Sequence, residues 1–322
     1  MKKLTALLLT LVMALSLTAC GNDVPAADEK IKIGILQQLE HVALDQAREG
    51  FVQALADNGY TDGETIVLDY QNAQSDQSNL QTMADRLVNN ENDLILAIAT
   101  GAAQTLAGKT KDIPILITAV TDPVDAGVVN SMEKPGTNVS GTSDASPMKE
   151  QLELMMQLKE SIKTVGLLYT SSEDNSVLQI NQVKEILNTM NVEYVEQTVT
   201  NSNDVQQAVQ SLVTKCDAIY IPTDNVLASS MALVADIAWP ANIPVVAGDE
   251  NMVAEGGLAT LGLSYYNLGY QTGEMAVRVL NGEDISAMPV ETQNEYNYII
   301  NAEALKVMTG ITIPRELEQY IK

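Results

Sequence analysis

The stretch IKIGILQQLEH, residues 31–41, indicates the fold expected for this chain. Its first six residues are rich in β-branched and apolar side chains, which is typical of a buried strand. Residues 37–41 are mostly polar, and residues 43–58 then place apolar side chains on one face of a helix that Gly59 ends. A strand, a polar loop and a helix form the first unit of an α/β fold.

The same alternation continues through the first half of the chain. Short apolar runs predict further strands at residues 66–70, 94–99 and 114–119. Stretches with helical periodicity lie between them at residues 79–88 and 102–107. This order of elements predicts a parallel sheet covered by helices.

The second half of the chain repeats the first at a separation of about 130 residues. The matched segments are Ile33–Leu36 with Val165–Tyr169, Asp93–Ala97 with Asp217–Ile221, and Ile113–Leu116 with Ile243–Val246. A repeat of this length is too long for a solenoid unit and has the size of a domain. The chain is therefore expected to contain two similar α/β lobes.

Polar loops follow the predicted strands in both copies. In open parallel sheets, ligands bind beyond the carboxyl ends of the strands. If the two lobes face each other, equivalent loops from both line one cleft. These loops are residues 37–41, 100–101 and 121–122 in the first copy and 170–175, 223–225 and 248–250 in the second.

The N-terminus has the features of an export signal. Lys2 and Lys3 precede an apolar stretch at residues 4–17, which is shorter than the roughly 20 residues that span a bilayer. The tetrad Leu17-Thr18-Ala19-Cys20 resembles a bacterial lipobox. We therefore expect a signal peptide at residues 1–19, acylation of Cys20 and a flexible tether at residues 20–30, which places the protein on the outer face of the cytoplasmic membrane. The alternative is an ordinary signal peptide with a chance cysteine.

The composition excludes several classes of function. Removing Lys2 and Lys3 lowers the number of basic residues from 18 to 16 against 42 acidic ones, so the formal charge becomes −26. Such a surface repels nucleic acid and anionic lipid. If Cys20 is acylated, Cys216 stands alone, and His41 is the single histidine. Neither a disulfide nor a metal site built from several cysteines or histidines is expected.

Motifs of cofactor binding and catalysis are missing. Gly108-Lys109 is preceded by Gly101, but six residues separate the two glycines where a phosphate-binding loop has four. The chain also contains neither the Gly-x-Ser-x-Gly nor the Gly-x-Gly-x-x-Gly pattern. We therefore expect no cofactor, and a protein that is not an enzyme.

Taken with the lipobox, four further segments resemble the ABC-transporter substrate-binding lipoproteins of the tryptophan-binding type. These segments are Gly34–His41, Ala119–Pro123, Pro135–Asp144 and Pro222–Asn225. The resemblance covers nearly all of the chain after the signal. It implies the type I periplasmic-binding-protein fold, with two Rossmann-like lobes and three hinge crossovers. It also implies an ABC permease and ATPase as partners, and an amino acid, often aromatic such as tryptophan or phenylalanine, as ligand.

That fold places the hinge crossovers near residues 142–147, 263–265 and 292–296. The N-terminal lobe would comprise residues 31–145 and 264–292. The C-terminal lobe would comprise residues 146–263 and 293–322. The two lobes would move about these crossovers when ligand binds.

Binding of an amino acid requires an anion site and a cation site. Helix N-termini favour anions, so Thr100 and Thr121 are expected to face the ligand carboxylate, although an N-cap role alone would explain Thr100. An ammonium group needs a carboxylate, for which Asp249 or Asp144 is the first choice. Turn and cap roles are the alternative for each loop acid.

The Glu40-His41 pair is expected to contact the ligand, with a structural role for the histidine as the alternative. The full set of predicted ligand-binding residues is Gln38, Glu40, His41, Thr100, Gly101, Thr121, Asp122, Ser143, Asp144, Thr223, Asp224, Asn225, Asp249 and Glu250.

Three other functions stay open. Aromatic residues are sparse, at 4% of the chain, which leaves few partners for an aromatic ligand beyond tyrosines such as Tyr169, Tyr265 or Tyr266. The ligand could instead be a sugar, a nucleoside or another metabolite. The chain could also be a cell-surface enzyme that uses Glu40, His41 and a loop aspartate, or a sensor that reports to a signalling partner.

Overall fold

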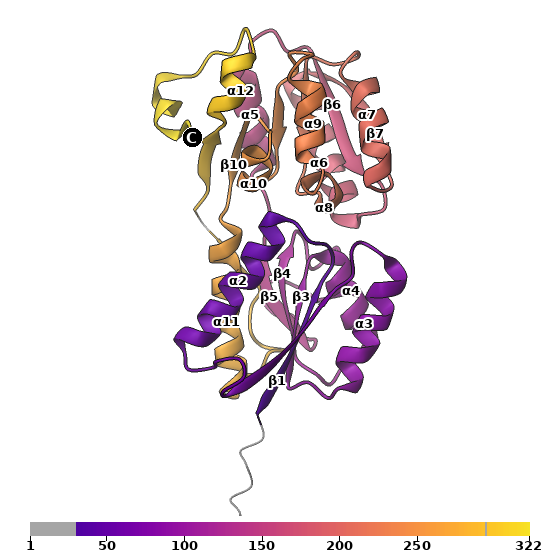
Figure 1. The fold of residues 1–322 in the computed structure, drawn as a ribbon, viewed down its shortest axis with the longest axis vertical. Coiled ribbons are helices and arrows are strands. Elements are labelled where there is room, and N and C mark those ends of the chain that lie inside the picture. Colours follow the sequence, from indigo (N-terminus) through magenta and orange to yellow (C-terminus); the bar gives the residue numbers. More distant parts are fainter. Residues whose placement is uncertain (1–29, 294) are drawn as a thin grey trace, which may run out of the picture.

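The computed structural model describes residues 30–293 and 295–322 and contains two lobes, each built on a six-stranded sheet (Figure 1). The signal peptide and the lipobox cysteine predicted from the sequence lie outside the described residues. In the described part of the chain, no helix is both long enough and apolar enough to cross a membrane.

The sheet of the first lobe has the strand order β11-β5-β4-β3-β1-β2, and its described strands are all parallel. Both β3 and β4 are buried along their whole length, as expected for central strands covered on both faces. The bounds are β1 Ile31–Gln37, β2 Ile66–Asn72, β3 Leu94–Ile98, β4 Ile115–Val120, β5 Val139–Ser143 and β11 Glu291–Thr292.

The sheet of the second lobe has the order β12-β10-β9-β8-β6-β7. Its strands are β6 Thr164–Thr170, β7 Glu193–Val199, β8 Ala218–Ile221, β9 Val245–Ala247, β10 Ala259–Gly262 and β12 Asn297–Ile300. The expectation of a wholly parallel sheet is wrong for β12, which is antiparallel to β10. Asn297, the first residue of β12, pairs with Gly262, the last residue of β10. The chain leaves the lobe after β10 and re-enters it at β12 from the same side, which is the side of the cleft, so the two strands run in opposite directions.

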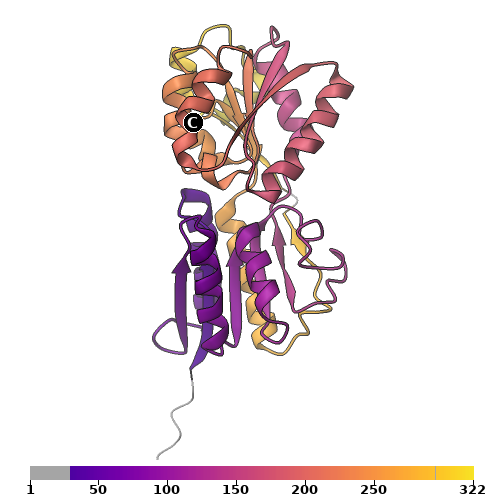
Figure 2. The same ribbon diagram turned by 90° about the vertical axis from the view of Figure 1, so that its right-hand side faces the viewer.

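Helices cover both faces of the two sheets (Figures 1 and 2). In β3, Leu94 and Leu96 pack against α2 and α11, whereas Ile95 and Ala97 pack against α3 and α4, since successive side chains of a strand point to opposite faces. The helices are α2 Val42–Asp57, α3 Gln77–Asn89, α4 Thr100–Lys109, α5 Met148–Leu158, α6 Asp174–Met190, α7 Val205–Leu212, α8 Asn225–Ala228, α9 Met231–Ala238, α10 Glu250–Ala254, α11 Tyr265–Leu280 and α12 Ala302–Val307, with 3₁₀ turns η1 Ser202–Asp204 and η2 Arg315–Tyr320.

The sequence repeat has counterparts in atomic detail. Asp93 accepts a hydrogen bond from the backbone N–H of Lys32, and the matched Asp217 accepts from the backbone N–H of Lys163 and Thr164. In both lobes the acid ties the start of the first strand to the start of the third. The two lobes are therefore built on one plan.

The chain passes between the lobes three times: after β5, after β10 and after β11. The second passage brings α11 back to the first lobe, where it lies beside α2 (Figure 1). This packing needs glycine, because a Cβ on Gly269 would lie 1.8 Å from the Ala47 carbonyl oxygen and one on Gly50 would lie 2.0 Å from the Tyr266 carbonyl oxygen. The tight contact fixes Tyr265, the first residue of α11, at the edge of the cleft.

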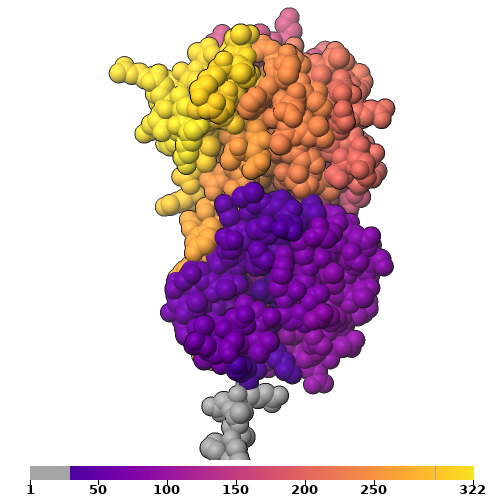
Figure 3. All heavy atoms as spheres, viewed as in Figure 1, coloured from indigo at the N-terminus to yellow at the C-terminus, as the bar shows by residue number. Residues whose placement is uncertain are grey.

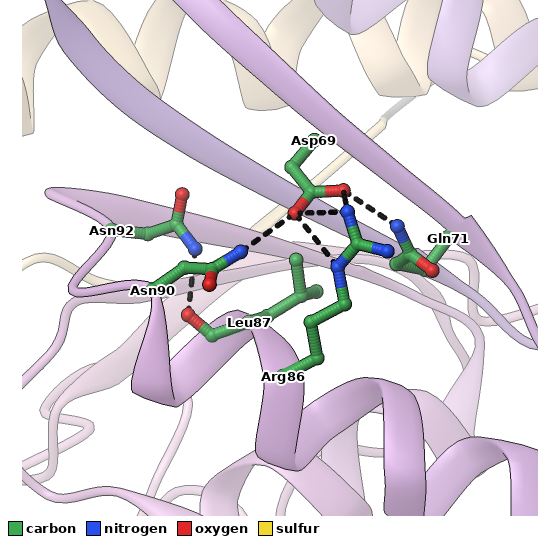
Figure 4. A network of polar contacts seen from close by, with 6 residues as sticks. All are labelled: Asp69, Gln71, Arg86, Leu87, Asn90 and Asn92. Atoms are coloured by element: carbon green, nitrogen blue, oxygen red, sulfur yellow. Dashed lines mark hydrogen bonds and ion pairs between the residues drawn. The ribbon is translucent and has the colours of Figure 1, made fainter.

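A polar network on the first lobe joins α3 to β2 (Figure 4). The Arg86 guanidinium donates to Asp69 with its closest contact at 3.1 Å, and the side-chain amides of Asn90 and Gln71 donate to the same carboxylate. Asn92 donates to the Leu87 carbonyl oxygen at 2.6 Å. The network orients α3, whose N-terminal end lies at the cleft.

Candidate ligand-binding cleft

A small cavity lies between the lobes, and we refer to it as the central cavity. Its volume is about 10 Å³, which is room for about one water molecule and far below the ~300–1,000 Å³ of most small-molecule pockets. The first lobe and its crossovers contribute His41, Leu44, Ala119, Thr121, Asp144 and Tyr265, and the second lobe contributes Asn175, Thr223, Asp224, Asn225, Ala228 and Asp249.

Side chains of the two lobes meet directly across this cavity. The His41 Nε2 atom lies 3.1 Å from Asn225 Oδ1, and the hydroxyl oxygens of Thr121 and Thr223 lie 3.4 Å apart. Further out, the Gln104 amide donates to Asp174 at 3.1 Å. In Figure 3 the atoms of the lobes touch along the cleft on the face shown. The lobes are therefore closed on each other.

Two carboxylates lie on the hinge side of the cavity. Asp144 follows β5 in the first crossover and accepts a hydrogen bond of 2.6 Å from the Tyr265 hydroxyl through Oδ2, while its Oδ1 has no partner among the described residues. Asp249 caps α10 by accepting from the backbone N–H of Asn251 and Met252. Both side chains are only 3% exposed.

These carboxyl groups are hard to ionise. Burial raises the pKa of Asp249 to about 6, and the nearby charge of Asp144 adds to this shift. Burial also raises the pKa of Asp144, although the hydrogen bond from Tyr265 opposes the change. Among the described residues that line the cavity there is neither lysine nor arginine. The cavity thus has a surplus of acidic groups that a cation from outside the protein would relieve.

A second acidic pair, Glu173 and Asp224, lies in the second lobe, where Asp224 lines the central cavity and Glu173 lines a larger groove beside it. Asp224 caps α8 and accepts from the backbone and hydroxyl of Thr170 at 2.6 and 2.8 Å and from Leu227 N–H at 2.9 Å. Glu173 accepts from the backbone and side-chain N–H groups of Asn225 at 3.1 and 2.9 Å. Burial and the charge of Asp224 raise the pKa of Glu173 to about 8.

The Asn225 contact settles the protonation of His41. Because Asn225 donates through Nδ2 to Glu173, its Oδ1 is the atom that accepts from His41 Nε2. Burial lowers the pKa of His41, so the ring is neutral with its proton on Nε2. His41 therefore joins the lobes as a hydrogen-bond donor.

A larger groove lies beside the central cavity, and we call it the outer groove. It has a volume of about 510 Å³, and Asn175 lines both the groove and the central cavity. Its wall is built of amides, hydroxyls and acids from the ends of β1, β2, β3, β6 and β7, including Gln38, Gln74, Asp76, Gln104 and Asp174.

Half of the predicted site residues line the central cavity: His41, Thr121, Asp144, Thr223, Asp224, Asn225 and Asp249. Gln38, Thr100 and Gly101 line the outer groove. The Gln38 side chain accepts from Gly101 N–H at 2.8 Å, so this amide at the start of α4 already has a partner. Thr100 is the first residue of α4 and Ala99 holds the N-cap position, so an N-cap role for Thr100 is wrong.

The other predicted residues line neither space. Glu40 is exposed, and Asp122 accepts from the backbone N–H of Val124 and Asp125 within its own turn. Ser143 is buried and donates to the Thr121 carbonyl oxygen at 2.8 Å, which positions Thr121. Glu250 is the half-buried first residue of α10, and the positive charge of Lys322 acts on it.

Several residues of the site were not in the predicted set. Asn175 lies in a strand-end loop that the repeat had marked, and Tyr265 had been considered only as a possible aromatic partner. Glu173 lies in the same loop as Asn175, one residue before α6. Among the described residues, no group of three or more histidine, cysteine or acidic side chains could hold a metal ion.

Two α/β lobes that close on a polar cavity define a bilobal ligand-binding protein with the type I periplasmic-binding-protein fold. A sequence model of the family described as ABC transporter substrate binding protein matches residues 32–321. A tyrosine-binding protein of Clostridioides difficile is 43% identical over 332 residues, covering 100% of this chain and 96% of that protein. The chain belongs to the ABC transporter substrate-binding protein family. Its role is therefore to bind a small molecule outside the cytoplasm for a transporter.

Two solved structures bear on the arrangement of the lobes. A complex with L-Trp from Streptococcus pneumoniae is 37% identical and superimposes with a TM-score of 0.87, covering 91% of this chain and 100% of that one. The ligand-free, open structure of a substrate-binding protein with adhesive properties from Clostridium difficile is 48% identical, yet its TM-score is 0.70, with 91% and 98% covered. The open structure is more similar in sequence than the L-Trp complex but superimposes less well, which indicates that its lobes are placed differently from the lobes of this protein. This difference agrees with the closed cleft described above.

Proposed function

We propose that this chain is the lipid-anchored receptor of an ABC importer for an aromatic amino acid, held on the outer face of the cytoplasmic membrane. The observation that carries the proposal is the pair of buried carboxyl groups, Asp144 and Asp249, in a cavity whose described wall has no basic side chain. An α-ammonium group supplies the missing positive charge. A permease and an ATPase would receive the ligand from the closed protein.

The ammonium would lie between the two carboxylates. Asp144 Oδ1 has no partner and can accept from it, while Asp249 contributes charge from the second lobe. In a closed cavity such charge-assisted hydrogen bonds are strong. The positive charge of the ammonium also offsets part of the electrostatic cost of ionising the two buried acids.

The α-carboxylate needs hydrogen-bond donors. Thr121 and Thr223 present one hydroxyl from each lobe, 3.4 Å apart, and His41 Nε2–H lies in the same cavity. A carboxylate that enters between the threonines would replace this weak contact with charge-assisted hydrogen bonds. The Thr223 hydroxyl would then turn away from Gln179 Oε1, to which it donates at 3.1 Å. These contacts involve both lobes, so the ligand would stabilise the closed form.

An aromatic side chain is supported by the relatives and by part of the wall. The 43% identical relative is named as tyrosine-binding, and the 37% identical structure contains L-Trp. Leu44, Ala119 and Ala228 give the cavity a small apolar surface, and the ring of Tyr265 lies on its hinge side. The cavity as it stands has a volume of only about 10 Å³, so a bound amino acid would hold the lobes further apart than they are here.

We propose the sequence-derived limits as the two moving units, residues 31–145 with 264–292 and residues 146–263 with 293–322. Acylation at Cys20 would tether them to the membrane. Growing cells with an alkyne-tagged fatty acid should label the wild-type protein and not Cys20→Ala, which should be released into the medium. A labelled Cys20→Ala protein would contradict the anchor.

The ligand is tested by titration calorimetry on residues 21–322 after unfolding and refolding to remove carried-over ligand. Tyrosine, tryptophan and phenylalanine are compared with tyramine, which lacks the carboxylate, and with 3-(4-hydroxyphenyl)propionate, which lacks the amine. We expect binding of at least one aromatic amino acid and a large loss for both truncated compounds. Binding of a sugar or nucleoside instead would replace the proposed ligand.

A further inference from the structure

Glu173 has an arrangement that a capping or packing role does not explain. It holds the N-cap position of α6, yet its side chain makes no capping hydrogen bond. The side chain is 5% exposed, and its Oε2 atom accepts both N–H groups of Asn225. The other oxygen, Oε1, has no partner among the described residues, although Glu173 lines the outer groove.

The neighbouring acid decides where the proton of this pair lies. Two buried carboxylates side by side do not both ionise at neutral pH. Asp224 accepts three hydrogen bonds, two from Thr170 and one from Leu227, which stabilise its charged form. Glu173 accepts two hydrogen bonds from Asn225 and lies near the Asn175 amide, and its burial beside the charge of Asp224 makes it the protonated member of the pair.

The position of the proton follows from the same contacts. Oε2 already accepts two N–H groups, so the hydrogen of the neutral acid is on Oε1. This makes Glu173 an O–H donor in the wall of the outer groove, and no hydrogen-bond acceptor among the described residues meets its Oε1 atom. A buried donor left unsatisfied costs free energy, and a ligand oxygen would remove that cost.

We propose that Glu173 is a specificity residue of the cleft, which as a neutral acid donates one hydrogen bond from Oε1 to an acceptor oxygen of the bound amino acid. This inference rests on the proposed function. The acceptor is a carboxylate or phenol oxygen, since an indole or phenyl side chain offers none. Ionisation of Glu173 would turn the donor into a repelling charge.

Other charged or titratable groups face Glu173 from several elements. Asp224 of the second lobe is the nearest acid, and His41 reaches the same Asn225 from the first lobe. Asp174 and Asp76 line the outer groove, but each is engaged, Asp174 with Gln104 and Asp76 with the backbone N–H of Asn79. None of the described groove residues is a lysine or arginine that would hold Glu173 in its charged form.

The test is the affinity for tyrosine between pH 6.5 and 9 for wild type, Glu173→Gln and Glu173→Ala. Glutamine keeps an acceptor for Asn225 and a donor at the place of Oε1, and it cannot ionise. We expect wild-type affinity to fall about tenfold per pH unit above about 8, where Glu173 loses its proton. Glu173→Gln should bind like wild type at pH 7 and stay unchanged up to the pH at which the ligand amine titrates. Glu173→Ala should bind about 10- to 100-fold more weakly.

Phenylalanine identifies the acceptor. If the preference for tyrosine over phenylalanine disappears in Glu173→Ala, the phenol oxygen is the acceptor; if both weaken equally, the carboxylate is. Either result supports the proposal. An infrared difference spectrum of wild type minus Glu173→Gln should show the carbonyl band of a protonated carboxylic acid at pH 7.

Two results would overturn this proposal and leave the proposed function standing. One is an identical pH profile for wild type and Glu173→Gln, and the other is a carboxylate band where the acid band is expected. If wild type binds no aromatic amino acid at any pH, the proposed function fails and this inference fails with it. If Glu173→Ala does not fold, the pH profile and the infrared band still decide the outcome.

Discussion

The Tyr265 hydroxyl donates a 2.6 Å hydrogen bond to Asp144 Oδ2, and the two residues belong to different passages of the chain between the lobes. Asp144 lies in the first crossover, and Tyr265 ends the second. The third crossover joins them, because the Tyr296 hydroxyl donates to the Ala145 carbonyl oxygen at 2.9 Å. A ligand cation at Asp144 would therefore touch a group to which all three hinge segments are linked.

We expect Tyr265→Phe to destabilise the protein by about 1–3 kcal/mol, because it leaves both oxygens of a buried carboxyl group without a partner. Thermal unfolding measures the change. Tyr296→Phe is the matched control, since it removes a hydroxyl from an exposed hinge contact and should cost less. If the two variants lose the same amount of stability, the burial of Asp144 does not strengthen the contribution of its hydrogen bond with Tyr265.

Asp249→Asn should abolish most ligand binding and leave the fold intact. Asparagine caps a helix as well as aspartate does, so α10 keeps its N-cap, while the charge that faces the ammonium is lost. We expect at least a 30-fold weaker affinity, about 2 kcal/mol or more. Asp122→Asn makes the same substitution in another capped turn outside the cavity and should bind like wild type. If Asp249→Asn also binds like wild type, the amine does not lie at Asp249.

The affinity should also fall at acidic pH. The pKa of Asp249 is raised to about 6, so protons compete with the ammonium below that pH and the affinity should drop about tenfold per pH unit. Calorimetry at pH 7, 6 and 5 measures this drop. A flat profile over the range would mean that the ionised form of Asp249 is not needed.

Stability without ligand should change in the opposite sense. The folded-state pKa of Asp249 lies above its ordinary value of 3.8, so the folded protein binds the proton more tightly than the unfolded chain between these values. The stabilisation that protonated Asp249 gives to the folded state is complete below about pH 4 and is lost as the pH rises through 6. We expect up to about 3 kcal/mol of added stability on lowering the pH from 7 to 4, to which other groups add their own changes. The pH dependence should be weaker in Asp249→Asn, and an equal dependence in the two proteins would contradict the shift.

Gly269→Ala should separate α11 from α2. The added Cβ would lie 1.8 Å from the Ala47 carbonyl oxygen, a backbone atom that cannot move alone. We expect a loss of about 1–3 kcal/mol, as for other overpacked interiors. Gly108→Ala in α4 is the control, because no atom lies within 4 Å of its Cβ and alanine favours a helix by about 1 kcal/mol. Denaturant unfolding should show opposite signs for the two variants, and a stable Gly269→Ala would refute the packing argument.

The architecture could be predicted because its signals are local. The apolar run at residues 31–36 and the helical pattern at residues 43–58 reappear as β1 and α2 within one or two residues. The repeat was visible in the sequence because matched positions make the same contacts. Asp93 and Asp217, for example, each accept a hydrogen bond from a backbone N–H at the start of the first strand of their lobe. The direction of β12 was missed, since it depends on the side from which the chain re-enters the lobe and no short pattern records this.

The site could be predicted only as a set of loops. Asp249 and Glu250 are adjacent and chemically alike, yet the backbone of α10 turns Asp249 into the cavity and leaves Glu250 half-exposed. The neighbouring residues Glu40 and His41 also differ, since Glu40 is exposed and His41 lines the cavity. Glu173 was overlooked because its importance comes from Asn225, which lies 52 residues further along the chain.

By itself, the sequence determined the two-lobed α/β plan, because periodicity, repeats and strand ends are properties of short segments. The crossing points of the chain and the loops at which a ligand could bind are predictions from the same signals. Only the tertiary structure decided which side chains share the cavity and how they titrate. Asp144, Asp249 and Tyr265 come together because α11 packs against α2 and the lobes close. Their pKa values are raised chiefly by burial, and burial exists only once distant segments have packed.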